Sequence, residues 1–184
     1  MNRMTVVIAV IAVFVILGLL GLVGCGGATR PDGGEGLLPV GSAVPKLSGV
    51  DQMGNPHTLD EVLGSVALIY FYPKDQTPGC TKEACAFRDV WSKYEAAGIK
   101  LFGVSKGTQE SHKEFSDKHS LPFPLIADAD MVWGTAFGVG SAMGMYKRVS
   151  FLIDKEGKVA KTYENVDPGL HAAQVLQDAA ALTP

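Results

Sequence analysis

This sequence has no excess of positive charge. Its 184 residues carry 16 Lys and Arg against 19 Asp and Glu, a net charge of -3, and the cationic residues are scattered rather than gathered into a stripe with interleaved aromatic residues. A protein that binds nucleic acid needs a basic surface for the phosphates, so we expect no nucleic-acid partner. Internal repeats are also missing, and no second low-complexity break follows the N-terminal part, which favours a single folded domain.

Charged residues are absent from residues 4–24, an apolar stretch that follows Arg3 and ends in small residues before Cys25. This layout is typical of a secretory signal, but a run of about 20 apolar residues also suffices to span a bilayer. Residues 1–24 are therefore either a signal peptide or an uncleaved membrane anchor. The ending LVGC resembles the lipobox of bacterial lipoproteins, which implies cleavage before Cys25 and attachment of lipid to that residue. We expect an extracytoplasmic, membrane-tethered protein.

Regular structure is not expected immediately after Cys25. Residues 26–42 are dense in Gly and Pro and show no apolar periodicity, a composition typical of a flexible tether. We therefore assign residues 25–40 to a lipidated cysteine and a flexible linker, and residues 41–184 to the folded domain.

The domain begins with a strand, a helix and a second strand. Residues 65–72 and 99–105 are nearly continuous apolar runs, as expected for strands that are covered on both faces. Between them, residues 80–98 place apolar side chains at helical spacing. A polar helix at 108–120, a short strand and helix, a hairpin at 148–164 and a terminal helix after Asp167 follow. We predict an α/β fold with a central mixed β-sheet flanked by helices.

Cysteine is scarce, and two of the three cysteines fall at the start of the first helix. Thr77 and Pro78 suit the capping and first helical positions, so Cys80 lies in the first turn, where free N–H groups stabilise a thiolate. If Cys85 is on the same helix, the two α-carbons are roughly 8 to 9 Å apart, whereas a disulfide tolerates about 7 Å. Bridging the pair would therefore require the first turn to unwind, which is typical of a reactive disulfide rather than a structural one.

This part of the sequence resembles the peroxiredoxins, and among them the bacterioferritin comigratory protein or peroxiredoxin Q type. The resemblance is carried by the pattern P-x-x-x-T-x-x-C, formed by Pro73, Thr77 and Cys80 within YFYPKDQTPGCTKEACAFRD, and it continues through LPFPLIAD and RVSFLID. It implies a thioredoxin-like fold in which Cys80 is the peroxidatic cysteine and Cys85 the resolving cysteine.

The same resemblance implies the rest of the site. Thr77 would orient the peroxide, Pro73 would shield the pocket, and Arg148 would hold the thiolate and the transition state, with Lys147 as the alternative cation. The substrate would be hydrogen peroxide or an organic hydroperoxide. The product would be an intramolecular disulfide between Cys80 and Cys85, which a thioredoxin-like thiol reductant would reduce. The resemblance favours a monomer, and we expect no cofactor and no metal site.

Two other functions are compatible with cysteines in a thioredoxin-like fold. A membrane-tethered thiol-disulfide exchange protein would use Cys-x-x-Cys, but four residues separate Cys80 from Cys85. A copper carrier would bind Cu(I) through two cysteines of a shorter spacing and a histidine. Neither pattern matches this chain as well as the peroxidase pattern does.

Several polar residues near these motifs have simpler interpretations. Glu83 in the first helical turn is interpreted as a favourable partner of the helix dipole, with the alternative that it organises Arg148. The histidines fall in polar turns or helices that we expect to be distant from the cysteine motif: His57, His112, His119 and His171.

Overall fold

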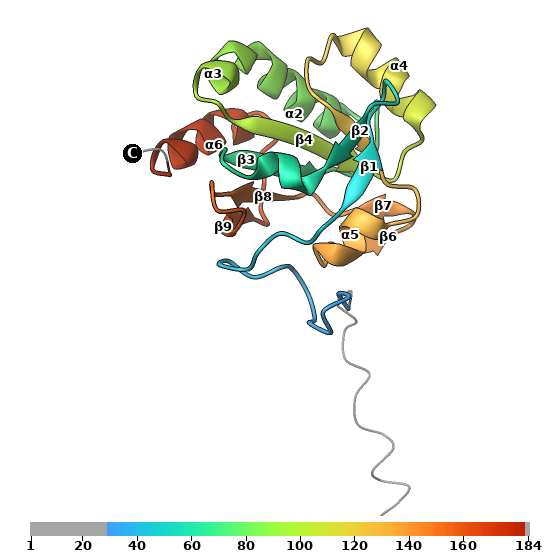
Figure 1. Cartoon of the computed structure of the whole chain (residues 1–184). Coiled ribbons are helices and arrows are strands. Elements are labelled where there is room, and N and C mark those ends of the chain that lie inside the picture. Colours follow the sequence, from blue (N-terminus) through green and yellow to red (C-terminus); the bar gives the residue numbers. More distant parts are fainter. Residues whose placement is uncertain (1–28, 183–184) are drawn as a thin grey trace, which may run out of the picture.

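The computed structural model describes residues 29–182, which form one α/β body (Figure 1). Cys25, with its predicted lipid, and the predicted signal peptide or anchor over 1–24 lie outside the described residues. Within 29–182, none of the helices combines the length and the apolar character needed to cross a bilayer.

The centre of the body is a five-stranded mixed sheet. β3 pairs in parallel with β4 and antiparallel with β8, and its position in the middle explains why its sequence is apolar throughout. The order across the sheet is β5 (Leu125–Ala127), β4 (Lys100–Ser105), β3 (Ala67–Phe71), β8 (Val149–Ile153) and β9 (Val159–Tyr163). The predicted mixed sheet and the predicted hairpin, β8 with β9, are confirmed.

Helices cover both faces of the sheet. The helical elements are η1 (Leu59–Val62), α2 (Pro78–Asp89), α3 (Trp91–Ala96), α4 (Gln109–His119), α5 (Val132–Ala136) and α6 (His171–Ala180). Two small hairpins, which the sequence patterns did not predict, lie outside the main sheet: β1 (Ser48–Val50) with β2 (Pro56–Thr58), and β6 (Ser141–Ala142) with β7 (Met145–Tyr146).

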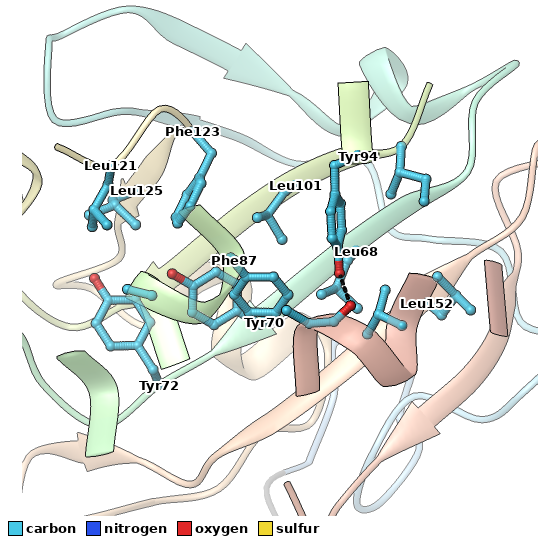
Figure 2. Packing of buried hydrophobic residues seen from close by; sticks show 14 of the residues in the cluster. Leu68, Tyr70, Tyr72, Phe87, Tyr94, Leu101, Leu121, Phe123, Leu125 and Leu152 are labelled. Carbon is cyan, nitrogen blue, oxygen red and sulfur yellow. Dashed lines mark hydrogen bonds between the residues drawn. The ribbon is translucent and has the colours of Figure 1, made fainter. Parts of the chain in front are cut away.

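The alternation of side chains along β3 divides the core into two clusters. Leu68, Tyr70 and Tyr72 pack against residues of α2, α3 and α6, whereas Ile69 and Phe71 face η1 and α5. Figure 2 shows the first cluster, in which rings from different elements meet edge to face or tilted. Within it, the Tyr94 hydroxyl donates a 2.9 Å hydrogen bond to the carbonyl oxygen of Ala172, which joins α3 to α6.

The segment before residue 41 is packed on the domain, which corrects the expectation of a flexible linker from residue 29 onward. The Leu38 side chain is 5% exposed and belongs to the second core cluster, and its N–H donates to the carbonyl oxygen of Phe137. Arg30 fixes the preceding turn, because its Nη1 donates to the carbonyl oxygens of residues 35–37. Apolar packing of Leu37 and Leu38 and the hydrogen bonds of Arg30 thus hold a segment whose composition indicates a linker.

Two helix boundaries also differ from the prediction. The helix expected over 80–98 is interrupted at Val90, whose φ of -113° and ψ of 14° end α2 before α3 begins. The terminal helix begins at His171 rather than directly after Asp167, because the Asp167 carboxylate accepts from the N–H of Gly169 and closes a turn first.

Candidate active site

Cys80 lies in the first turn of α2, directly after the carboxyl end of the central strand β3. Thr77 is the N-cap residue with extended backbone, and Pro78 occupies the first helical position, as the sequence predicted. The Cys80 residue is 2% exposed. The free N–H groups of this turn make it a favourable place for a thiolate, because they carry the positive end of the helix dipole.

Arg148 reaches Cys80 from a distant part of the sequence. It directly precedes β8, and because Phe71 of β3 pairs with Val149 of β8, the arginine arrives beside the end of β3. Its Nη2 donates to Cys80 Sγ over 3.2 Å, and its Nη1 donates to Glu83 Oε2. The arginine side chain is 17% exposed. The fold thus brings together Cys80 and Arg148, two of the predicted site residues.

Glu83 is the residue that holds this arginine, which supports the alternative interpretation rather than the dipole interpretation. Its side chain is fully buried, and its second oxygen, Oε1, makes no hydrogen bond within residues 29–182. Burial raises the pKa of Glu83 from 4.5 to about 7 and outweighs the attraction of Arg148, which lowers it. Burial lowers the pKa of Arg148, but Glu83 and Cys80 together raise it above its ordinary value.

Thr77 and Pro73 lie on the half-buried loop between β3 and α2. The Thr77 hydroxyl donates to the carbonyl oxygen of Lys74 over 3.0 Å, so its oxygen keeps lone pairs free to accept a hydrogen bond from a substrate. Pro73 follows Tyr72, which is the first residue after the end of β3. Both residues lie next to the turn that carries Cys80, as the motif implied.

A buried polar cluster that sequence reasoning missed anchors this loop. The Asp75 carboxylate accepts hydrogen bonds from the Tyr72 hydroxyl at 2.8 Å, from Ser111 Oγ at 2.6 Å and from His112 Nδ1 at 2.7 Å. Burial raises the pKa of Asp75, but these hydrogen bonds and the charge of His112 lower it below its ordinary value. Asp75 lies between Pro73 and Thr77 in the P-x-x-x-T pattern, and this position is the only feature of the sequence that points to a role for it.

Cys85 is half-buried on the same helix, and neither it nor Cys80 is in a disulfide. Its Sγ lies 4.0 Å from Nδ1 of His119, the last residue of α4, and Arg88 Nη1 donates to the His119 carbonyl oxygen over 2.7 Å. The expectation that all four histidines are distant from the cysteine motif is therefore wrong: His119 contacts the second cysteine, and His112 anchors the loop before the first.

A cavity of about 390 Å³ borders the site. Arg148 and Lys147 line it together with Glu164 and Asn165 and, from the N-terminal segment, Gly36 and Leu37. The exposed Lys147 thus lies at this cavity, but it is Arg148 that contacts Cys80.

Comparisons with known proteins agree with this arrangement. A profile of the AhpC/TSA family matches residues 40–162. The chain is 38% identical to a putative peroxiredoxin bcp from Coxiella burnetii over 146 residues, 76% of this chain and 97% of that protein, and 37% identical to peroxiredoxin Bcp from Bacillus subtilis over 147 residues, 76% and 94%.

Among solved structures, the chain is similar to peroxidoxin BcpB from Mycobacterium tuberculosis, with a TM-score of 0.74, 29% identity and coverage of 80% of this chain and 99% of that one. It is also similar to a peroxiredoxin Q variant from Xanthomonas campestris, with a TM-score of 0.69, 36% identity and coverage of 73% and 90%. The thioredoxin-like fold implied by the sequence is confirmed by these neighbours.

Proposed function

The chain belongs to the AhpC/TSA family and is a thiol peroxidase of the peroxiredoxin type, and on that premise we propose that Cys80 reacts with the peroxide and Cys85 resolves the product. The observation that carries this assignment is the 3.2 Å contact between Arg148 Nη2 and Cys80 Sγ in the first turn of α2. A cation and free backbone N–H groups around one buried sulfur are the setting in which a cysteine becomes a nucleophile.

The first step breaks the O–O bond of the peroxide. The Cys80 thiolate attacks one oxygen, and the other oxygen leaves as water or as an alcohol after taking a proton, so Cys80 becomes a sulfenic acid. Negative charge grows on the leaving oxygen, and Arg148 with the N–H groups of the first turn stabilises that charge more than it stabilises the reactants. Thr77 orients the peroxide through its hydroxyl, and Pro73 shields the pocket.

The second step uses Cys85. Its thiol condenses with the sulfenic acid, water leaves, and an intramolecular disulfide forms, which a thioredoxin-like dithiol then reduces. The substrates we propose are hydrogen peroxide and organic hydroperoxides. A related bacterioferritin comigratory protein from Xanthomonas campestris, 34% identical with a TM-score of 0.71, is described by its alkyl peroxide reduction activity, which supports the second class.

We further propose that the enzyme acts as a monomer outside the cytoplasm, tethered to a membrane by lipid on Cys25 or by an uncleaved anchor. The lipobox-like LVGC after an uncharged apolar run supports this location. If Cys25 carries lipid, the wild type should be labelled by a radioactive fatty acid and should lack residues 1–24, and Cys25→Ser should not be labelled. A wild type that stays in the membrane unlabelled, with residues 1–24 intact, would favour the uncleaved anchor.

The decisive experiment on the peroxidase assignment uses the full chain carrying Cys25→Ser, so that Cys80 and Cys85 are its two thiols. One equivalent of peroxide should be consumed much faster than by a free thiol, with the loss of two hydrogen atoms and a linked Cys80–Cys85 peptide. Cys85→Ser should consume one peroxide and then stop, whereas Cys80→Ser should not react. Full turnover by Cys85→Ser would show that Cys85 is not the resolving cysteine.

Thiol-disulfide exchange and copper transport remain the competing functions. A chain that reduces a model disulfide efficiently while reacting with peroxide no faster than a free thiol would be an exchange protein. Stoichiometric Cu(I) binding by the reduced chain without peroxidase activity would indicate a carrier. The four residues between Cys80 and Cys85 favour neither, because exchange proteins use Cys-x-x-Cys and copper carriers a shorter spacing than this one.

A further inference from the structure

The contact between His119 and Gln76 indicates which ring nitrogen of His119 carries the hydrogen and which one faces Cys85. Nε2 of His119 lies 3.4 Å from Oε1 of Gln76, and the same oxygen accepts a hydrogen bond from Lys118 Nζ at 3.1 Å. Because Oε1 is an acceptor, Nε2 carries the ring hydrogen of the neutral imidazole. Nδ1 then presents a lone pair, and it lies 4.0 Å from Cys85 Sγ.

The charges around His119 favour the neutral ring. Arg88 approaches from α2, and Lys118 directly precedes His119 on α4. The edge contact with Phe115 and the neutral Gln76 complete the surroundings of His119. Burial and the positive charges of Lys118 and Arg88 all lower the pKa of His119 below 6.5. At neutral pH the ring is therefore able to accept a proton.

We propose, on the basis of the function proposed above, that His119 is the base that takes the proton of the Cys85 thiol when Cys85 attacks the oxidised Cys80. The thiol proton passes to Nδ1, and the thiolate sulfur attacks the sulfenic sulfur of Cys80. A disulfide forms, the S–O bond breaks, and hydroxide leaves as water with the proton that the imidazolium returns. One thiol and one sulfenic acid give one disulfide and one water.

The helix geometry allows this contact to persist during the reaction. Bridging requires the first turn of α2, which carries Cys80, to unwind, whereas Cys85 and Arg88 lie further along the helix. Arg88 is tied to α4 through the His119 carbonyl oxygen at 2.7 Å, so this end of α2 stays next to the imidazole. Arg88 also lies close enough to Cys85 to stabilise the thiolate once it forms; Asp89 and Cys85 both raise the pKa of Arg88.

The test separates the two chemical steps. His119→Asn keeps a hydrogen-bonding atom near the position of Nδ1 but cannot act as a base, and Lys118→Ala is the matched control, because Lys118 neighbours His119 in sequence and shares its partner Gln76. Each variant, in the full chain, is mixed with one equivalent of hydrogen peroxide. Sulfenic acid and disulfide are then quantified by acid quench and mass spectrometry over time.

We expect His119→Asn to react with peroxide at the wild-type rate but to form the disulfide about 10- to 100-fold more slowly, within the lower range of general base catalysis. With one equivalent of peroxide the sulfenic acid on Cys80 should persist, and a second equivalent should convert it to sulfinic acid in His119→Asn more than in the wild type. The wild-type rate of disulfide formation should reach a plateau near neutral pH, where His119 is neutral, whereas that of the variant should keep rising with pH as hydroxide replaces the base. Lys118→Ala should keep the plateau, with its onset at higher pH because the charge of Lys118 no longer lowers the pKa of His119.

An unchanged rate of disulfide formation in His119→Asn would overturn the proposal. If the peroxide step of that variant also slows, which would indicate disturbed folding, the wild-type profile decides: a plateau near pH 7 supports the base, and a steady rise beyond pH 8 excludes it. Failure of the proposed function is recognised separately, because full turnover by Cys85→Ser would mean that Cys85 is not the resolving cysteine.

Discussion

Glu83 gives the sharpest prediction about the active site. It is a fully buried carboxyl group bound to Arg148 through one oxygen, and burial raises its pKa from 4.5 to about 7. Replacing it with Gln keeps the shape of the side chain and one carbonyl oxygen for Arg148 but removes the ionisation. We expect Glu83→Gln to be more stable than the wild type above pH 7 and, at the same time, a poorer peroxidase.

The size of the stability effect follows from the pKa. Between pH 4.5 and 7 the folded protein keeps a proton on Glu83 that the unfolded chain has lost, so the free energy of unfolding falls as the pH rises through this window. A rise of the pKa from 4.5 to about 7 corresponds to about 3 kcal/mol above pH 7. Gln resembles the protonated acid, so Glu83→Gln should gain about this much at pH 8 and almost nothing at pH 4.

The effect on the rate has the opposite sign. Arg148 loses a charge-assisted hydrogen bond and keeps a neutral one, so it is held less firmly against Cys80 Sγ. A loss of about 1.4 kcal/mol of transition-state stabilisation lowers the rate about tenfold. The reaction with peroxide should therefore be about tenfold slower at pH 7.

Urea unfolding of the reduced wild type and variant at a series of pH values between 4 and 8 measures the stability effect. The difference between the two proteins is the quantity to follow, because His171 contributes to both. Burial lowers the pKa of His171 from 6.5 to about 4, so its contribution raises stability as the pH rises over this range, opposite to Glu83. If Glu83→Gln is less stable than the wild type at pH 8, and increasingly so as the pH rises from 4, the attraction of Arg148 exceeds the effect of burial and the reasoning fails.

Three further substitutions test other parts of the structure. Arg148→Lys keeps the charge but loses the two-pronged guanidinium, so the peroxide step, followed by stopped-flow fluorescence, should slow about 100-fold; a rate within threefold of wild type would contradict the role of its geometry. Asp75→Asn sets an amide among three hydrogen-bond donors in a buried cluster, and urea unfolding should show a loss of about 2 to 4 kcal/mol, whereas a loss below 0.5 kcal/mol would mean that the cluster does not anchor the loop. Gly138→Ala would place a methyl group 1.8 Å from the carbonyl oxygen of Gly36, so limited proteolysis before residue 41 should accelerate; Gly144→Ala, also at positive φ but without a neighbour within 4 Å, should not change it, and equal rates in both variants would speak against the packing of this segment.

The fold and the first cysteine were predictable because their signals are local. A strand covered on both faces reads as one apolar run, and the turn Thr77-Pro78 followed by Cys80 contains the capping residues themselves. Arg148 needed the resemblance to a family, because nothing in its own neighbourhood shows that β8 pairs with β3.

What the sequence did not reveal depends on packing between distant segments. His119 meets Cys85 because the end of α4 lies against α2, and the buried Glu83 meets Arg148 because the start of β8 lies beside α2. Polar residues at such helical positions usually face solvent, so the sequence favoured an exposed position for both rather than a contact with the site. Leu38 is one of few apolar residues in a Gly-rich stretch, and no periodicity predicts its burial.

The packing of Leu38 also sets how far the domain can move from whatever holds residue 25. Thr29 pairs with Glu35 and therefore lies close to Gly36, where the segment meets the domain. Three residues lie between Cys25 and Thr29, and the four steps from one to the other, at about 3.5 Å each, extend to at most about 14 Å. A linker that stayed free up to residue 40 would reach about 50 Å. With lipid on Cys25, the active site would stay close to the lipid headgroups. The enzyme would then meet hydroperoxides of membrane lipids more readily than peroxides far from the membrane.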